Sequence, residues 1–160
     1  TDTISKIGEN IQVVSFTSYK SSEFTYLTYL HNKYSENAAK IGSVIGIKSD
    51  KEISDSLKFD LKIIPMQVSA MKPMAIDKDS LNPKILEDEV DIIKKQMGDV
   101  NPEKIDQIIS GKINKFVKEN TLLEQSLISD PKMTVSTLLK DCGSKNDASL
   151  KIMLMDLYSI

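Results

Sequence analysis

His31 is the only histidine and Cys142 the only cysteine of this 160-residue chain, so any reactive chemistry would have to begin with one of them. A lone histidine cannot build a metal site, which usually takes three or four convergent ligands. His31 could still act as an acid or base together with Tyr29 and a carboxylate, and an enzyme of that kind stays open as an alternative. Cys142 has no second histidine or other base to pair with, so we expect an inert thiol.

Carboxylates gather at one place in the sequence, at Glu87, Asp88, Glu89 and Asp91. They fall in the first two turns of a predicted helix, where negative charge favours the helix dipole. Carboxylates adjacent in sequence point apart on a helix, so we interpret the cluster as a solvated helix start and not as a cation site. The sequence contains no Walker loop and no Gly-x-Gly-x-x-Gly motif, so we expect no bound nucleotide. We predict no catalytic residue, no cofactor and no metal, and therefore no enzyme.

Length, composition and charge narrow the class of protein further. The chain fits one globular domain over residues 1–160. It has 21 basic and 23 acidic residues and a net charge of −2, which argues against a general binder of nucleic-acid backbone, because such proteins carry a basic excess. Every basic residue is lysine, which excludes an arginine finger within the chain. No apolar run is long enough to predict a membrane span.

Runs of β-branched and aromatic residues predict an α+β fold with a small antiparallel sheet of three to four strands packed by helices. The predicted strands cover residues 11–18, 24–31, 41–47 and 150–160. Residues 19–23 have the length of a hairpin connection, and residues 32–40 are predicted as a loop. Gly42 and Gly46 lie two positions either side of Val44 on one face, which indicates either the close approach of another backbone or a weak strand.

Residues 52–72 carry apolar side chains at helical spacing, with Asp50 or Ser54 available to cap the helix start. Pro65 lies inside this pattern. Because proline removes one backbone hydrogen bond, we expect a kink near residues 61–64.

A projecting antiparallel helical hairpin, or coiled-coil arm, is predicted over residues 82–118, inserted in the domain. Asn82-Pro83 and Asn101-Pro102 each place a capping side chain before a proline, which is a typical helix start. A short turn at Gly98-Asp99 separates the two helices, so they must lie antiparallel. A later helix is predicted to open at Asp130-Pro131, with a turn at residues 143–147 after it. Its inward-facing residues would be Val135, Leu138 and Leu139.

Four short segments form a recognisable pattern along the chain. Residues 6–10 read Lys-Ile-Gly-Glu-Asn, and Tyr29-Leu30-His31 is followed after a loop by Lys40-Ile41-Gly42. Residues 64–73 read IPMQVSAMKP. The fourth segment lies within residues 111–139 and comprises Gly111, Lys115, Phe116, Leu122, Leu123, Gln125, Asp130, Thr134, Val135, Leu138 and Leu139. Together they resemble the elongation factor Ts family, the nucleotide-exchange factors of elongation factor Tu, whose motifs read KIGEN, Tyr-x-His with Lys/Arg-Ile-Gly, IAMHVAAMNP and GRMKKFxxEVxLLxQPFVxDxxxTVxxLL.

The chain also departs from the family pattern. Pro65 stands in place of an alanine, Gln67 in place of a histidine, and Lys112-Ile113 in place of Arg-Met. The family's N-terminal helical domain is not found, nor is the first half of its core. That half carries a Thr-Asp-Phe/Val segment whose aromatic side chain helps to dislodge magnesium from the partner. With no initiator methionine or signal peptide, we interpret the chain as the C-terminal core of an elongation factor Ts and a piece of a longer protein.

The resemblance implies a translation elongation factor that binds elongation factor Tu, both GDP-bound and nucleotide-free, and promotes GDP release. In the family the histidine of Tyr-x-His touches the third domain of elongation factor Tu, which makes His31 an expected contact. The KIGEN loop sits beside the partner's nucleotide domain, which makes Ile7, Gly8 and Glu9 expected contacts. The ordinary alternatives are a strand-end histidine bonded to a neighbour and a plain loop before a strand.

The alternative function is a non-catalytic module for dimerisation or docking, since the family's arm contributes to dimerisation or partner contact in some members. We therefore expect elongation factor Tu as partner, a homodimer as the second candidate assembly, and no direct contact with nucleic acid or a membrane. The single cysteine fits a reducing compartment. The expected location is a bacterial cytoplasm, with the mitochondrial matrix as the alternative.

Overall fold

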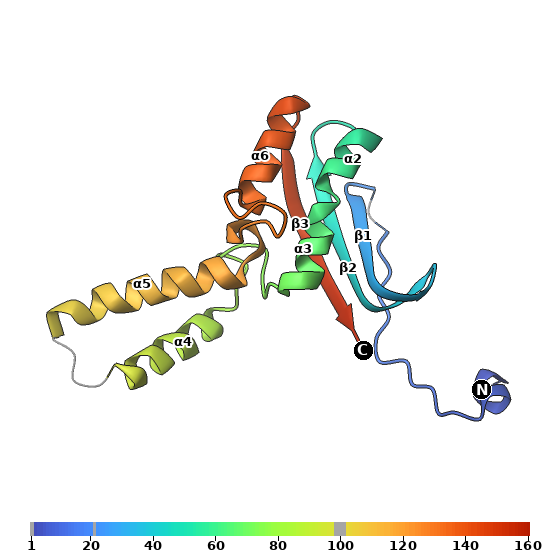
Figure 1. Ribbon diagram of the computed structural model, residues 1–160, viewed down its shortest axis with the longest axis horizontal. Helices are drawn as coiled ribbons and strands as arrows, with labels where there is room; N and C mark the ends of the chain where they lie inside the picture. Colours follow the sequence, from blue (N-terminus) through green and yellow to red (C-terminus); the bar gives the residue numbers. More distant parts are fainter. Residues whose placement is uncertain (1, 21, 98–101) are drawn as a thin grey trace.

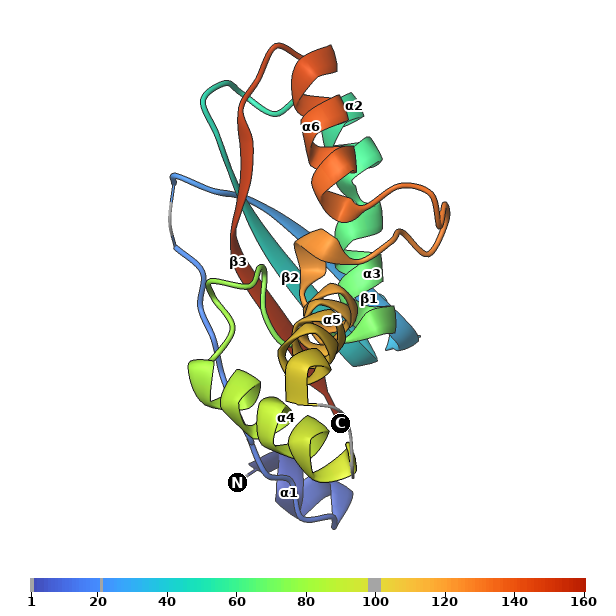
Figure 2. The same cartoon turned by 90° about the vertical axis from the view of Figure 1, so that its left-hand side faces the viewer.

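The computed structural model describes residues 2–20, 22–97 and 102–160. It has the predicted α+β fold: a three-stranded antiparallel sheet of order β1-β2-β3 carries helices on one face (Figures 1 and 2). The strands are β1 (Thr25–Ser35), β2 (Ala38–Ser49) and β3 (Leu150–Ser159). Among the described residues, no helix is long and apolar enough to cross a membrane.

The core lies between the sheet and three helices, α2 (Asp55–Leu61), α3 (Ile63–Met71) and α6 (Val135–Lys145) (Figure 2). Alternate residues of a strand face opposite sides of a sheet, so only one set of side chains from each strand enters this core. Burying one aliphatic side chain contributes about 1.5–3 kcal/mol. The fully buried aliphatic residues here are Ile45, Ile47, Leu57, Leu61, Ile64, Val68, Leu122 and Val135.

The helix predicted over residues 52–72 is two helices, because Lys62 interrupts it between α2 and α3. This is where the kink was expected, since Pro65 has no N–H to donate to the carbonyl four residues earlier. The Lys62 N–H bonds only three residues back, at 3.2 Å, which tightens the turn. Ser54 is the cap, and its side chain accepts a hydrogen bond from the Leu57 N–H.

Helices α4 (Pro83–Gln96) and α5 (Pro102–Asn120) extend away from the sheet, α4 leading outward and α5 leading back (Figure 1). Asn82 caps α4 as predicted, by accepting from the Lys84 N–H at 3.0 Å. The predicted turn between the helices falls at residues 98–101, outside the described residues. The continuous hairpin arm of residues 82–118 therefore stays a prediction, as does its insertion in a single domain.

Residues 11–18 are not a strand, so the prediction of a strand there is wrong. The predicted hairpin connection at 19–23 is wrong for the same reason, because it would need that strand. Residues 11–19, which we call the crossing segment, cross the face of the sheet that the helices leave open (Figure 2). Val13, Val14 and Phe16 are largely exposed there. A β-branched segment becomes a strand only where a neighbouring strand supplies partners for its backbone. This one lies over the face, away from the free edges that β1 and β3 offer.

Other element boundaries differ between the prediction and the structure. The loop predicted at residues 32–40 is mostly strand, because backbone pairing of β1 with β2 continues past the apolar residues, with an irregularity between Lys33 and Ser35. Helix α6 begins at Val135, capped by Thr134, and not after Pro131. The same helix runs through Lys145, into the turn predicted at 143–147.

Hydrogen bonds fasten the crossing segment to the open face. The Tyr19 hydroxyl donates to Asp156 Oδ2 at 2.7 Å and lies 2.8 Å from the Tyr158 hydroxyl. Tyr158 in turn donates to Thr17 Oγ1 at 2.7 Å. Burial, followed by the hydrogen bonds to Tyr158 and Asp156, raises the pKa of Tyr19 above its ordinary value. The hydroxyl therefore keeps the proton that it donates.

Gly46 is needed for side-chain packing on the open face. A Cβ on Gly46 would lie 3.0 Å from the Leu154 Cβ, 3.5 Å from the Tyr26 ring and 3.6 Å from the Phe24 ring. Side chains, and not another backbone, are therefore what approaches this glycine.

Gly143→Ala and Gly111→Ala are expected to change the free energy of unfolding in opposite directions. A Cβ on Gly143 in α6 would lie 2.6 Å from the Ala148 carbonyl oxygen, whereas one on Gly111 in α5 would meet nothing within 4 Å. We expect a loss of about 1–3 kcal/mol from overpacking at Gly143 and a gain of about 0.5–1 kcal/mol from helix propensity at Gly111. Urea denaturation measures both, and equal changes would contradict this account.

Candidate partner-binding site

Segments that are far apart in sequence meet around His31. The histidine comes from β1, and its neighbours come from α3 and from the loop that precedes α6. They form a small surface depression of about 160 Å³, which we call the His31 cup. Its lining residues are Tyr29, His31, Met66, Ser69, Ala70 and Ile128. Three of the four segments that carry the family pattern thus contribute to one place on the surface.

Strand alternation places the aromatic pair of the cup. Leu27, Tyr29 and His31 occupy alternate positions of β1, and Leu27 is buried in the core beneath the helices. Tyr29 and His31 therefore lie on the same face of the sheet as Leu27, where the Tyr29 side chain is half-buried and the His31 side chain is exposed. The Tyr29 hydroxyl lies 3.2 Å from His31 Nδ1, and the ring centroids are 6.0 Å apart. This contact matches the ordinary alternative for His31, while its exposure leaves the ring accessible to a partner.

The acid–base set required by the enzyme alternative is not assembled in the His31 cup. Tyr29 and His31 are in contact, but the described residues that line the cup include no carboxylate. The lining is mainly aliphatic and aromatic, which suits recognition by burial better than proton transfer. Sequence reasoning did not single out Met66, Ala70 or Ile128, although each lies within a segment that carries the family pattern.

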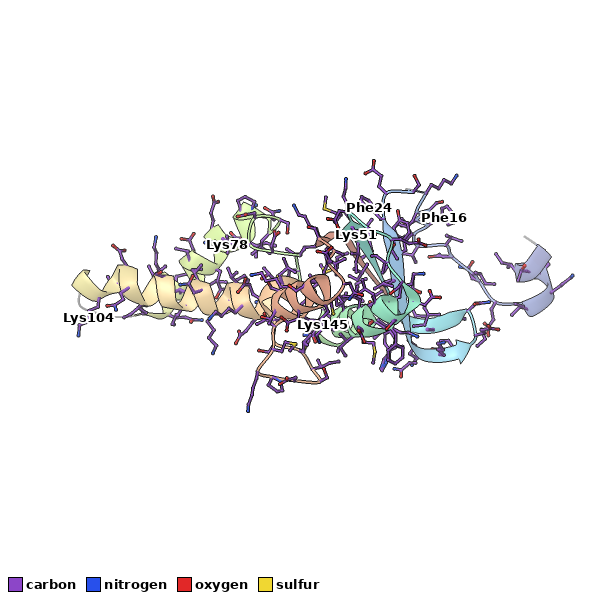
Figure 3. All side chains as sticks on the ribbon, turned by 90° about the horizontal axis from the view of Figure 1, so that it is seen from above. Phe16, Phe24, Lys51, Lys78, Lys104 and Lys145 are labelled. Carbon is purple, nitrogen blue, oxygen red and sulfur yellow. The ribbon has the colours of Figure 1, made fainter. Side chains whose placement is uncertain are left out.

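Ile7, Gly8 and Glu9 lie elsewhere. Helix α1 (Asp2–Ile7), which was not predicted, ends here, and the Gly8 N–H donates to the Ile4 carbonyl at 2.8 Å. Gly8 has φ +75°, a left-handed conformation that suits glycine after a helix. All three residues are exposed, and α1 stands apart from the sheet (Figures 1 and 3). The four predicted contact residues therefore fall into two separate places.

A larger groove of about 900 Å³ lies on the open face of the sheet. It is lined by residues 12–15, by part of β1, by the first half of β2 and by residues 158–160. Phe16 and Phe24 lie on the side of the sheet away from α3 (Figure 3). The aliphatic residues of the groove include Val13, Val14, Leu30, Val44 and Ile160.

Cys142 belongs to α6, and its side chain lies in the core and is 5% exposed. Burial, and next the nearby Asp60 carboxylate, raises the pKa of its thiol above the ordinary value. Since the thiolate is the reactive form, both effects make the side chain unreactive.

Comparison with known proteins identifies the family. The sequence profile described as "Elongation factor TS" matches residues 1–158. The protein named elongation factor Ts of Ehrlichia ruminantium (strain Welgevonden) is 32% identical over 159 residues, covering 98% of this chain and 55% of that relative. Those of Alkalilimnicola ehrlichii and of Clostridium kluyveri (strain ATCC 8527) are 35% and 33% identical, covering 89% and 93% of this chain.

The chain belongs to the elongation factor Ts family, whose members are translation elongation factors. It spans about half the length of the curated relatives that it matches, with 55%, 45% and 47% of them covered.

Cys142 is expected to resist modification while the protein is folded. At pH 8, reaction with dithionitrobenzoate should be roughly 100-fold slower for native than for urea-unfolded protein, because burial limits access and disfavours the thiolate. The release of thionitrobenzoate measures both rates, and Cys142→Ala gives the blank. A fast reaction in the native state would contradict the burial described here.

Proposed function

We propose that this chain acts in translation elongation as part of an exchange factor that binds elongation factor Tu and promotes release of GDP. The observation that carries the proposal is the convergence of three family-matching segments on one exposed surface, the His31 cup. Residues that serve folding alone need not meet at an accessible place. The relatives' name, elongation factor Ts, supports the same assignment.

The mechanism that follows is thermodynamic linkage. A protein that binds elongation factor Tu more tightly without GDP than with GDP must, by reciprocity, weaken GDP binding by the same factor. Moving such an equilibrium from 1:99 to 99:1 takes about 5.5 kcal/mol of differential binding. The chain supplies binding surface for this linkage, and no covalent chemistry is required of it.

Two contacts with elongation factor Tu are proposed. His31 and its neighbour Tyr29 form the first, where an accessible ring stands beside a small apolar depression. Ile7, Gly8 and Glu9 form the second, at the exposed end of α1, where the bare Gly8 admits close approach and Ile7 offers an exposed apolar side chain.

The 160-residue chain alone should bind elongation factor Tu weakly and accelerate the release of fluorescent GDP little or not at all. In the resembling family, magnesium displacement belongs to a Thr-Asp-Phe/Val segment, and this sequence contains neither form. Stopped-flow fluorescence measures the release rate. Rates equal to those of a full-length elongation factor Ts would refute this expectation.

His31→Ala should weaken binding to nucleotide-free elongation factor Tu by about fivefold to tenfold, because truncation removes the accessible ring that the proposed contact buries. Tyr34→Ala is the matched control, since Tyr34 is exposed on the same strand but does not line the cup. Titration calorimetry gives both affinities. Equal effects of the two substitutions would remove His31 from the contact.

A second candidate function is a dimerisation module, favoured by the open face of the sheet. Antiparallel sheets that face water normally carry polar residues on that side. Here the exposed side carries Leu30, Val44 and Leu154 at half-buried positions, beside the largely exposed Val14 and Phe16. A second copy of the chain could cover these side chains.

If the open face joins two copies, Phe16→Lys should shift the chain toward the monomer in gel filtration by placing a charge in the interface. Phe59→Lys makes the same substitution at a similarly exposed phenylalanine on α2 and should leave the elution volume unchanged. Light scattering across a concentration series gives the mass. A wild-type chain that stays monomeric at high concentration would exclude this candidate.

A further inference from the structure

Gln67 lies on α3 with its side chain fully buried. Its Nε2 donates to Gln125 Oε1 at 3.2 Å and to the Ser126 carbonyl oxygen at 3.0 Å. Its Oε1 accepts from the Ile128 N–H at 2.9 Å. The amide therefore uses both its donor and its acceptor sides on a single loop, residues 125–128.

This loop sends two neighbouring side chains in opposite directions. Leu127 is 4% exposed and belongs to the core, whereas Ile128 is 45% exposed and lines the His31 cup. The backbone of Leu127 itself is bonded to the loop further on, because its N–H donates to the Met133 carbonyl at 2.8 Å. The backbone on both sides of Leu127 is bonded to Gln67, which decides where the Ile128 side chain lies.

We propose that Gln67 is a positioning residue of the His31 cup: it holds the backbone of residues 126–128 on α3, so that Ile128 forms one wall beside Tyr29 and His31. The proposal rests on the proposed function, since it treats the cup as a contact with elongation factor Tu. Gln67 itself touches no partner, because it is sealed beneath the loop.

The chemistry of the site decides which side chains can replace Gln67. Leucine would fill similar space but would leave the Ile128 N–H and the Ser126 carbonyl without partners, which favours movement of the loop toward water. Histidine can accept at one ring nitrogen and donate at the other. It is also the residue of the resembling family pattern at this position.

A double-mutant cycle with elongation factor Tu tests the proposal. Gln67→Leu should weaken binding by about tenfold, and Ile128→Ala, at an exposed position, should weaken it by a similar factor. In the Ile128→Ala background, Gln67→Leu should cost less than about twofold, because Gln67 acts through Ile128. Gln67→His should restore binding to within about threefold of wild type.

Thr121→Val is the matched control for lost stability. It removes one buried hydrogen bond, from Thr121 Oγ1 to the Val117 carbonyl at 2.8 Å, where Gln67→Leu removes three, and Thr121 lines no part of the cup. It should lower thermal stability but change affinity by less than about twofold. The proposal is overturned if Gln67→Leu binds like this control, if its effect is undiminished without the Ile128 side chain, or if Gln67→His fails to restore binding.

Hydrogen exchange of the wild-type chain supplies a test that needs neither a variant nor a partner. The Ile128 amide should exchange slowly although its side chain is exposed, because it donates to the buried Gln67. The Ser129 amide supplies the comparison, and equal rapid exchange of the two would overturn the proposal. If the wild type does not bind elongation factor Tu at all, the proposed function fails, while this measurement still decides whether Gln67 holds the loop.

Discussion

The packing of α3 across β2 is the contact on which both the core and the His31 cup depend. Ile64 and Val68 of α3 share the fully buried core with Ile45 of β2. The Ser43 hydroxyl donates to the Pro65 carbonyl at 2.6 Å and accepts from the Ser69 hydroxyl at 3.0 Å, which ties the helix to the strand. With α3 fixed over the sheet, its buried amide holds the loop before α6 and its other side chains border Tyr29 and His31.

This arrangement places core and surface side chains within a few residues of each other. Leu127 contributes to the core while Ile128 remains at the surface, and Leu27 is buried two positions before the half-buried Tyr29. An accessible apolar depression positioned by a rigid core loses little conformational freedom when it binds. Such a depression would suit the proposed linkage between protein binding and nucleotide release, which depends only on differences in affinity.

The sequence correctly predicted those parts of the fold that depend on residues close together in the chain. Asn82 capped its helix, Ser54 capped another, and Pro65 accounted for the break at Lys62, because caps and prolines act through bonds within one turn. The strand predicted at residues 11–18 failed because a strand needs backbone partners from elsewhere, and composition does not reveal whether they exist. The start of α6 was misplaced since the turn after Pro131 also satisfies the local signals.

The sequence by itself determined the capped starts of α2 and α4, the alternation that turns His31 toward one face, and the single histidine and cysteine from which chemistry would begin. Only the tertiary structure decided that β1, α3 and the loop of Ile128 meet in one cup, and that Ile7 and Gly8 stand apart from it. The physical reason is the distance along the chain over which each kind of interaction acts. Caps, turns and side-chain periodicity are fixed within a few residues, whereas the meeting of distant segments depends on how whole elements pack around a shared core.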